Sequence, residues 1–429
     1  MESYYPVFTK ILNQELLTAL GCTEPICIAY CSAEMRKALG AEPEKITVRC
    51  SGNLVKNAKG ATVPNSGGLK GIAASAILGA VGGNPEKKLE LLTEVTPEQI
   101  AHAKELLAAD ICEVKLLEHE EDNLQVVITG TANGHTAEAE LKHTHTNICR
   151  VVRDGVTLFE NNAAAEQDRG EIDKLCAELS IRRIIDYAEH VDLDGADSPR
   201  STIEHQIACN TQISVEGLKN NWGASVGKVL LDQDKSVRMR AAASAAAGSD
   251  ARMSGCELPV VINSGSGNQG ITVTMPVLQY AAEWKKSHDE TIRALLISNL
   301  VAIHIKAAYG RLSAFCGAVS AATGSSAAIT WMAGGTYEQI CAAITNTLGT
   351  ISGMVCDGAK PSCASKIASA VETAITGYNM AMHSEQFCGG DGLVKDDIEQ
   401  TIRSIGRMAS EGMVSTDQKI LELMLAKEV

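Results

Sequence analysis

The sequence predicts an α+β fold in which a mainly helical domain is combined with a smaller α+β module of three to four antiparallel strands. Residues 112–153 contain short runs of alternating apolar and polar residues separated by turns, which is typical of half-buried strands. From Glu171 onward the chain is rich in Ala and Gly and has few β-branched runs, which indicates packed helices. At 429 residues it is long enough for two or three domains.

The domain limits are expected where these patterns change. Residues 1–84 should form N-terminal helices and polar loops that pack with the C-terminal domain. Residues 85–165 should form the small α+β domain, and residues 166–429 the helical domain. The polar stretch AAAEQDRGEID, residues 163–173, is helix-prone and is expected to return the chain to the main body.

The N-terminal elements follow from apolar spacing and stop signals. Apolar residues recur every three or four positions in 5–20 and 24–39, and a glycine follows each run, so two helices are expected. A strand should follow at Lys45–Cys50. The glycines and asparagines of SGNLVKNAKGATVPNSGG, residues 51–68, predict turns. The small residues of GLKGIAASAILGAVGG, residues 68–83, predict a tightly packed helix.

The small module begins with a charged helix, expected from Pro97 to Ala109. Asn133-Gly134 is a hairpin-turn signal between two of the alternating runs that follow. These runs predict four strands: Cys112–Leu117, Leu124–Thr131, Thr136–His143 and Asn147–Arg153.

Charge and composition exclude several kinds of partner. The net charge is −14 and no Lys/Arg cluster is dense, which argues against nucleic acid. Aromatic residues make up only 3 %, so the stacking platforms of single-strand binders are missing. A small molecule is the expected partner, and a homodimer is a reasonable default for such a chain.

The chain is expected to be cytoplasmic and not to enter a membrane. Its first residues, MESYYPVFTKILNQELL, lack the basic start and continuous apolar run of a secretory signal, and no run of about twenty apolar residues follows. Fourteen cysteines in a reducing compartment should therefore be thiols or metal ligands, and most of them ordinary buried residues.

Three cysteines form the first candidate site. Cys316 lies in RLSAFCGAV, and Cys356 and Cys363 lie seven apart in GMVCDGAKPSCASK, where glycine and proline let both thiols turn toward one point. Three thiolates around an iron–sulfur cubane leave one iron without a protein sulfur, which suits a Lewis acid. From the spacing alone, ordinary packing of buried thiols remains the alternative.

GCTEP, residues 21–25, is the second candidate. Cys22 should lie between two helices, where free amides of the second helix would stabilise a thiolate, with Thr23 as the helix cap. Simple capping is the alternative, and a cluster held by Cys22, Cys27 and Cys31 is another, although their spacing does not match a ferredoxin.

Two polar loops and a histidine pair complete the candidates. SGNLVKN and NSGSGNQG, residues 51–57 and 263–270, place Asn, Ser and Lys between glycines, which suits the charged groups of an amino acid but matches no nucleotide motif. Turns alone are the alternative. In HTHT, residues 143–146, the two histidines could share a metal on one face of a strand, but no third ligand is evident.

Taken in order, GCTEP, SGN-x-x-KN, NSGSGNQG and the Cys-x6-Cys loop resemble the iron–sulfur L-cysteine desulfidases, relatives of the iron–sulfur L-serine dehydratases. The resemblance covers essentially the whole chain. It implies a carbon–sulfur lyase with a [4Fe-4S] cluster and no pyridoxal phosphate, which converts L-cysteine to pyruvate, ammonia and hydrogen sulfide. By motif, Cys316, Cys356 and Cys363 look like the cluster ligands and Cys22 like the catalytic thiol.

The remaining roles are expectations about substrate binding. The residues expected to hold or flank the amino acid are Thr23, Glu24, Ser51, Asn53, Lys56, Asn57, Asn268 and Gln269. L-Serine dehydration on the same scaffold is the nearest rival. A hydro-lyase acting on a hydroxy acid would need several arginines in these loops, which have none, and a non-enzymatic iron–sulfur sensor would need a basic surface for DNA.

Overall fold

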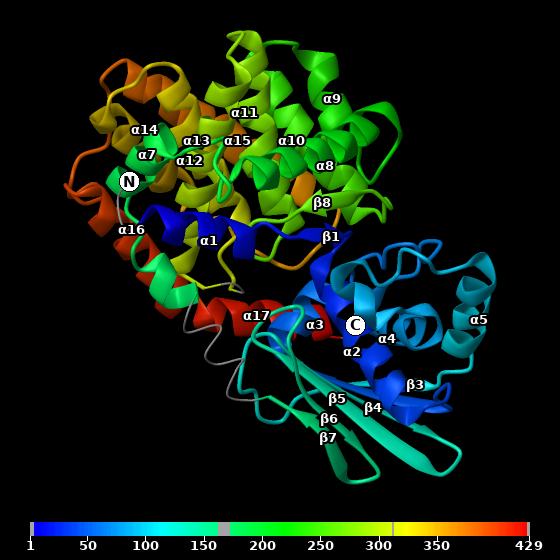
Figure 1. Ribbon diagram of the computed structural model, residues 1–429. Coiled ribbons are helices and arrows are strands. Elements are labelled where there is room, and N and C mark those ends of the chain that lie inside the picture. Colours follow the sequence, from blue (N-terminus) through cyan, green and yellow to red (C-terminus); the bar gives the residue numbers. More distant parts are fainter. Residues whose placement is uncertain (1–3, 162–171, 311–312, 427–429) are drawn as a thin grey trace.

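The computed structural model describes residues 4–161, 172–310 and 313–426, and it has two parts (Figure 1). A large helical body lies above a smaller part in which a sheet is covered by helices. The predicted α+β fold is confirmed. The predicted boundary at 165/166 and most of the helix-prone stretch 163–173 fall outside the described residues.

The sheet is larger than expected, with six strands in the order β3-β2-β4-β5-β6-β7. Only β2 and β3 are parallel, and the other neighbours are antiparallel. Asn133 and Gly134 both have positive φ, 52° and 78°, as the hairpin between β4 and β5 requires. The strands are β2 Lys45–Cys50, β3 Cys112–Leu116, β4 Gln125–Ala132, β5 His135–Lys142, β6 Ile148–Arg153 and β7 Val156–Glu160.

Two sheet features escaped sequence analysis. β7 is an edge strand whose five residues are all exposed, so it has no apolar alternation to recognise. β2 comes from the N-terminal segment but pairs between β3 and β4, a long-range contact that local pattern does not encode.

Helices α2, Thr23–Leu39, and α4, Gly71–Gly82, cover the sheet and pack tightly on each other. A Cβ at Gly79 would lie 2.2 Å from the carbonyl oxygen of Ala29, so this crossing requires glycine. The 3₁₀ helix η1, Pro85–Glu90, and α5, Pro97–Ala108, follow α4. α5 begins with a capping box between Thr96 and Gln99, close to its predicted start.

The helical body is built around α10, Val237–Met253, whose residues 241–253 are all buried. It packs against α8, α9, α11 and α15, and its alanines allow these helices to approach closely. The other helices of this body are α7 Ile181–His190, α8 Arg200–Lys219, α9 Val226–Gln233, α11 Gly267–Glu283, α12 His288–Ala307, α13 Gly317–Met332, α14 Tyr337–Ile351, α15 Cys363–Met382 and α16 Ile398–Arg407.

The N-terminal segment departs from the predicted pattern at two places. The first helix, α1, covers only Tyr5–Glu15, because residues 18–20 form β1 and pair with β8, Pro259–Val261, of the helical body. The predicted turns after β2 contain a helix, α3, Gly52–Ala58. In both cases a tertiary contact overrides the local signal.

The C-terminal segment lies along the junction of the two parts (Figure 1). After the π-helical turn η2, Met408–Gly412, helix α17, Val414–Leu425, packs on α3. Lys56 of α3 forms an ion pair with Asp417 of α17, and the lysine side chain is only 1 % exposed. Among the described helices, none combines the length and apolar character needed to cross a bilayer.

Candidate active site

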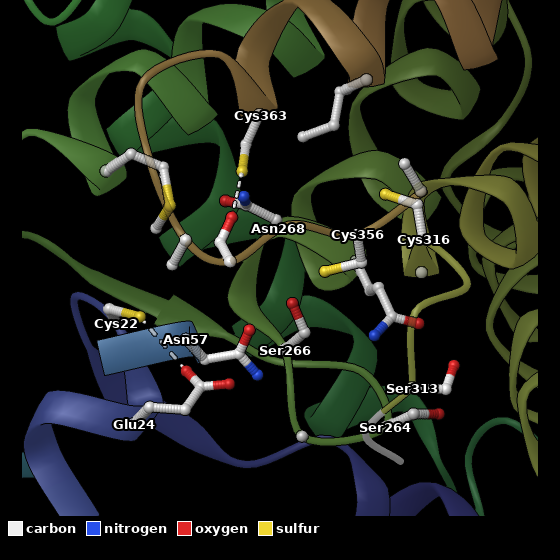
Figure 2. A pocket seen from close by; sticks show the side chains of 18 of the residues that line it. Cys22, Glu24, Asn57, Ser264, Ser266, Asn268, Ser313, Cys316, Cys356 and Cys363 are labelled. Atoms are coloured by element: carbon white, nitrogen blue, oxygen red, sulfur yellow. Dashed lines mark hydrogen bonds between the residues drawn. The ribbon is translucent and has the colours of Figure 1, made fainter. Parts of the chain in front are cut away.

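A cavity of about 820 Å³, measured out to its open mouth, lies between the N-terminal segment and the helical body. Figure 2 shows Cys22 and Glu24 of α2 on one side, and the three candidate ligand cysteines on the other. The predicted residues that line it are Cys22, Glu24, Asn57, Asn268, Gln269, Cys316, Cys356 and Cys363.

Cys316 and Cys356 are held side by side by backbone hydrogen bonds. Phe315 and Val355 form an isolated antiparallel bridge. The Cys316 N–H donates to the carbonyl of Met354 at 3.0 Å, and the Cys356 N–H donates to that of Ala314 at 2.6 Å. Two segments forty residues apart in sequence are thereby fixed with both thiols at one cavity.

Cys363 joins them from the start of α15. Its Sγ lies 3.7 Å from the carbonyl oxygen of Gly358, which is in the connecting loop. Gly358 has a φ of +93°, and a Cβ there would lie 2.3 Å from the carbonyl oxygen of Lys56. The loop therefore rests directly on the backbone of α3, and only glycine allows this approach.

Four helices begin at this cavity. Cys22, Ser266 and Cys316 are the N-caps of α2, α11 and α13, Cys363 is the first residue of α15, and all four line the cavity. Helix N-termini present free N–H groups and a partial positive charge. These helix starts therefore favour a bound anion such as a carboxylate.

When no metal is bound, the thiols of Cys316 and Cys363 are protonated. Burial, followed by the neighbouring Cys356, raises the pKa of Cys316 to about 12, and burial also raises the pKa of Cys363. A coordinated metal reverses this preference, since it binds the thiolate. The Lys366 ammonium, which donates to the Val355 carbonyl at 2.8 Å, adds positive charge beside these cysteines.

This donor set fits an iron–sulfur cluster better than a single ion. In the described residues, no three His, Cys, Asp or Glu side chains converge closely enough to hold one metal ion. In a cubane each thiolate binds a different iron, so the sulfurs surround a volume and do not meet at a point. Three thiols spread around one cavity meet that requirement.

Cys22 lies at the predicted helix start, but its surroundings do not favour the expected thiolate. Its Sγ donates a hydrogen bond to Glu24 Oε2 at 3.2 Å. Burial, and then the adjacent carboxylate, raises the pKa of Cys22 well above its ordinary value, and these effects exceed that of the helix amides. In the resting site Cys22 is a thiol that is hydrogen-bonded to a base.

Glu24 is that base, and it is charged. Burial alone would raise its pKa, but His145, the Cys22 hydrogen bond and Arg252 together hold the pKa of Glu24 below its ordinary value. Thr23 adds a hydrogen bond from its hydroxyl to Glu24 Oε2 at 3.0 Å. The cavity thus contains a carboxylate with a transferable proton beside it.

Comparison with known proteins now places the chain. The family described as serine dehydratase alpha chain matches residues 86–422. The chain belongs to the serine dehydratase alpha chain family. Over 431 residues it is 48% identical to a "UPF0597 protein" of Treponema denticola, covering 99% of both chains. A "UPF0597 protein" of Finegoldia magna is 48% identical over 421 residues, covering 98% of this chain and 99% of the relative.

Membership of the serine dehydratase alpha chain family supports a lyase of the iron–sulfur type. It does not decide between cysteine and serine as substrate. The names of the two relatives do not state an activity.

Sequence analysis did not single out two cationic residues that line this cavity, Arg252 and Lys306. Arg252, in the last turn of α10, lines the cavity, but this alanine-rich helix contains no signal of a binding loop. His145 of the HTHT motif also lines the cavity, whereas His143 does not. His143 Nδ1 pairs with Asp122 Oδ2 at 2.9 Å beside a neighbouring cavity, so the two histidines do not share a metal.

Four of the expected substrate ligands do not line this cavity. The Ser51 hydroxyl donates to the Asn123 carbonyl at 2.7 Å, Lys56 pairs with Asp417, and Asn53 borders the neighbouring cavity. Thr23 is buried, and its hydroxyl also contacts the Gly265 carbonyl at 3.1 Å. Because the expected loop is helix α3, only Asn57 of this segment reaches the cavity.

The alternative cluster site on α2 is not supported. Cys27 and Cys31 are fully buried, and neither lines the cavity with Cys22. Cys31 Sγ packs against the sheet, 3.3 Å from the Ala139 carbonyl. Their one-turn spacing reflects helix packing in this serine dehydratase-type fold.

Proposed function

We propose that the protein is an L-cysteine desulfidase, which eliminates hydrosulfide from L-cysteine with the help of a [4Fe-4S] cluster. The observation that carries this proposal is that Cys316, Cys356 and Cys363 line one cavity together with Cys22. The ordered motifs shared with iron–sulfur cysteine desulfidases support cysteine as the substrate, and the family match supports the lyase class.

Different residues of the cavity have different roles in the proposed reaction. Cys316, Cys356 and Cys363 would hold the cluster, which when bound supplies an open iron as a Lewis acid for the leaving group. Asn57 and Asn268 offer side-chain amides for the polar groups of the substrate. The helix N-termini favour the substrate carboxylate.

Proton removal is assigned to Cys22 and Glu24. The α-proton of an amino acid is weakly acidic, so a positioned base is required. When Cys22 passes its proton to Glu24, the resulting thiolate takes the α-proton. The electron pair of the Cα–H bond forms the Cα=Cβ double bond, and hydrosulfide leaves with the electrons of the Cβ–S bond. The released aminoacrylate tautomerises and hydrolyses to pyruvate and ammonia.

L-Serine dehydration is the second candidate, favoured by the description of the matching family. The same proton transfers would then expel hydroxide in place of hydrosulfide. A hydro-lyase for di- or tricarboxylates is disfavoured, because Arg252 is the one arginine among the described residues that line the cavity.

Anaerobic reconstitution tests the proposal. The protein is incubated with iron and sulfide, and pyruvate, sulfide and ammonia are assayed with L-cysteine and, separately, with L-serine. Higher kcat/KM for cysteine supports the desulfidase, and higher kcat/KM for serine supports the dehydratase. A reconstituted brown protein that converts neither amino acid would refute both.

A further inference from the structure

Arg252 is a buried cation in the cavity wall. It is 3 % exposed, and its Nη1 donates to Asn268 Oδ1 at 3.2 Å. Its Nε is buried and makes no hydrogen bond. The guanidinium therefore reaches the cavity with part of its donor set unused.

The charge of Arg252 is also incompletely balanced. Among the described residues, Arg252 donates one hydrogen bond, to the neutral side chain of Asn268, and forms no ion pair with a carboxylate. Glu24 acts on it electrostatically, but Glu24 Oε2 already accepts from Cys22 and Thr23. A buried guanidinium without a directly paired anion is costly, so a site for an anionic group is indicated.

The backbone around Arg252 is built to accommodate it. A Cβ at Gly267 would lie 2.3 Å from Arg252 Nε, so glycine leaves the space that the guanidinium fills. Gly267 and Asn268 form the first turn of α11, whose free amides point the same partial positive charge at the cavity. Arginine, amide side chain and helix start form one anion-binding corner.

Glu24 supplies the opposite charge. It extends from α2 toward the cavity (Figure 2), and its carboxylate is ionised. An α-amino acid carries one carboxylate and one ammonium group on the same carbon. The cavity lining offers a partner for each, since it contains cationic side chains, Arg252 and Lys306, and the anionic Glu24.

Resting on the proposed function, we propose that Arg252 and Asn268 bind the α-carboxylate of the substrate while Glu24 faces its α-ammonium group. The site then selects zwitterionic 2-amino acids with a small β-substituent. A 2-hydroxy acid lacks the ammonium group, and a second carboxylate would meet Glu24.

Two fragments of cysteine test the carboxylate contact and the ammonium contact separately. 3-Mercaptopropionate retains the carboxylate and lacks the ammonium group, and cysteamine has the reverse. Their dissociation constants are measured by titration calorimetry on the anaerobically reconstituted protein. Arg252→Gln should weaken 3-mercaptopropionate about 10- to 100-fold and leave cysteamine within about 3-fold. Glu24→Gln should weaken cysteamine selectively.

Arg240→Gln is the matched control, since Arg240 lies on the same helix but pairs with Glu283 at the surface. It should change neither constant, and cluster absorbance reports whether each variant is intact. Unchanged 3-mercaptopropionate binding in Arg252→Gln, or equal loss of both fragments, would overturn the inference. Because fragment binding needs no turnover, this result is independent of whether wild-type protein converts cysteine or serine.

Discussion

At the scale of single residues, Cys22 illustrates how burial and one neighbour decide the chemistry of a side chain. The helix start stabilises a thiolate, but burial and the carboxylate of Glu24 raise the pKa of Cys22 and keep the proton on sulfur. The hydrogen bond to Glu24 then provides a route for that proton to leave. The cysteine and the glutamate act as one unit.

Cys22→Ala should abolish turnover, because the thiolate that takes the substrate α-proton would be missing. We expect a loss of at least about 10²-fold in kcat with unchanged cluster absorbance. Cys31→Ala is the control: this thiol on the same helix is buried against the sheet, and its loss should spare activity. Loss of the absorbance in Cys22→Ala would instead identify Cys22 as a cluster ligand.

Asp250 gives a pH-dependent contribution to stability. Burial raises its pKa from 3.8 to about 6, although its Oδ2 accepts from the Gly227 N–H at 3.0 Å. The folded state therefore binds this proton more tightly than the unfolded state, and the free energy of unfolding falls as pH rises from about 4 to 6. The difference corresponds to at most about 3 kcal/mol.

Asp250→Asn should remove this penalty. The variant should be more stable than wild type at pH 7.5, and the advantage should disappear near pH 4. Urea unfolding at both values measures it, with Asp232→Asn, an exposed position on α9, as the control. An advantage that is equal at both pH values would contradict the assignment.

Individual residues also show how much of the site could be predicted from the sequence. Glycine, proline and spacing made Cys356 and Cys363 candidates, and the resemblance in motif order assigned them, together with Cys316, as cluster ligands. Arg252 was not a candidate, because nothing in an alanine-rich helix indicates that its last turn borders a cavity. Lys56 was assigned to the substrate because a lysine between asparagines suggests a binding loop, whereas the fold buries it under α17.

At the scale of elements, segments with a local periodic or capping signal were predictable, and segments that depend on distant partners or on an exposed edge were not. α2, β2 and α5 lie within a residue or two of their expected bounds, since apolar spacing and capping are local signals. β1 and β7 depend on partners distant in sequence or on an exposed edge. α3 depends on α17, which packs on it from the other end of the chain.

Removing one partner of the ion pair between α3 and α17 should cost more stability than removing the other. Asp417→Ala leaves the Lys56 cation buried without its partner and should destabilise the protein by about 3 kcal/mol. Lys56→Met removes the cation and fills similar space, so it should cost less than about 1 kcal/mol. Urea unfolding of both variants tests the pair. An increase in KM for Lys56→Met would restore Lys56 as a substrate ligand.

At the scale of the whole molecule, the loop between Cys356 and Cys363 lies directly against the backbone of α3 at Gly358. Gly358→Ala combines a strained left-handed backbone with a Cβ placed against the Lys56 carbonyl. We expect lower iron content per chain and a loss of about 1–3 kcal/mol in stability.

Gly353→Ala is the control for that variant. Gly353 lies in the same connection, but a Cβ there would meet nothing within 4 Å. Iron and sulfide analysis after reconstitution, with thermal unfolding, compares the two. Equal cluster content in both variants would show that the loop tolerates displacement from α3.

The four helix starts at the cavity have a consequence for long-range electrostatics. The protein carries a net charge of −14, so its outer field repels anions, while the backbone dipoles create a local region of opposite sign inside. A polyanionic metabolite is repelled by this outer field before it reaches the cavity. A zwitterion has no net charge, so the outer field does not oppose its approach. Inside the cavity its carboxylate and its ammonium group each have a separate partner. The rate of entry should therefore depend little on ionic strength.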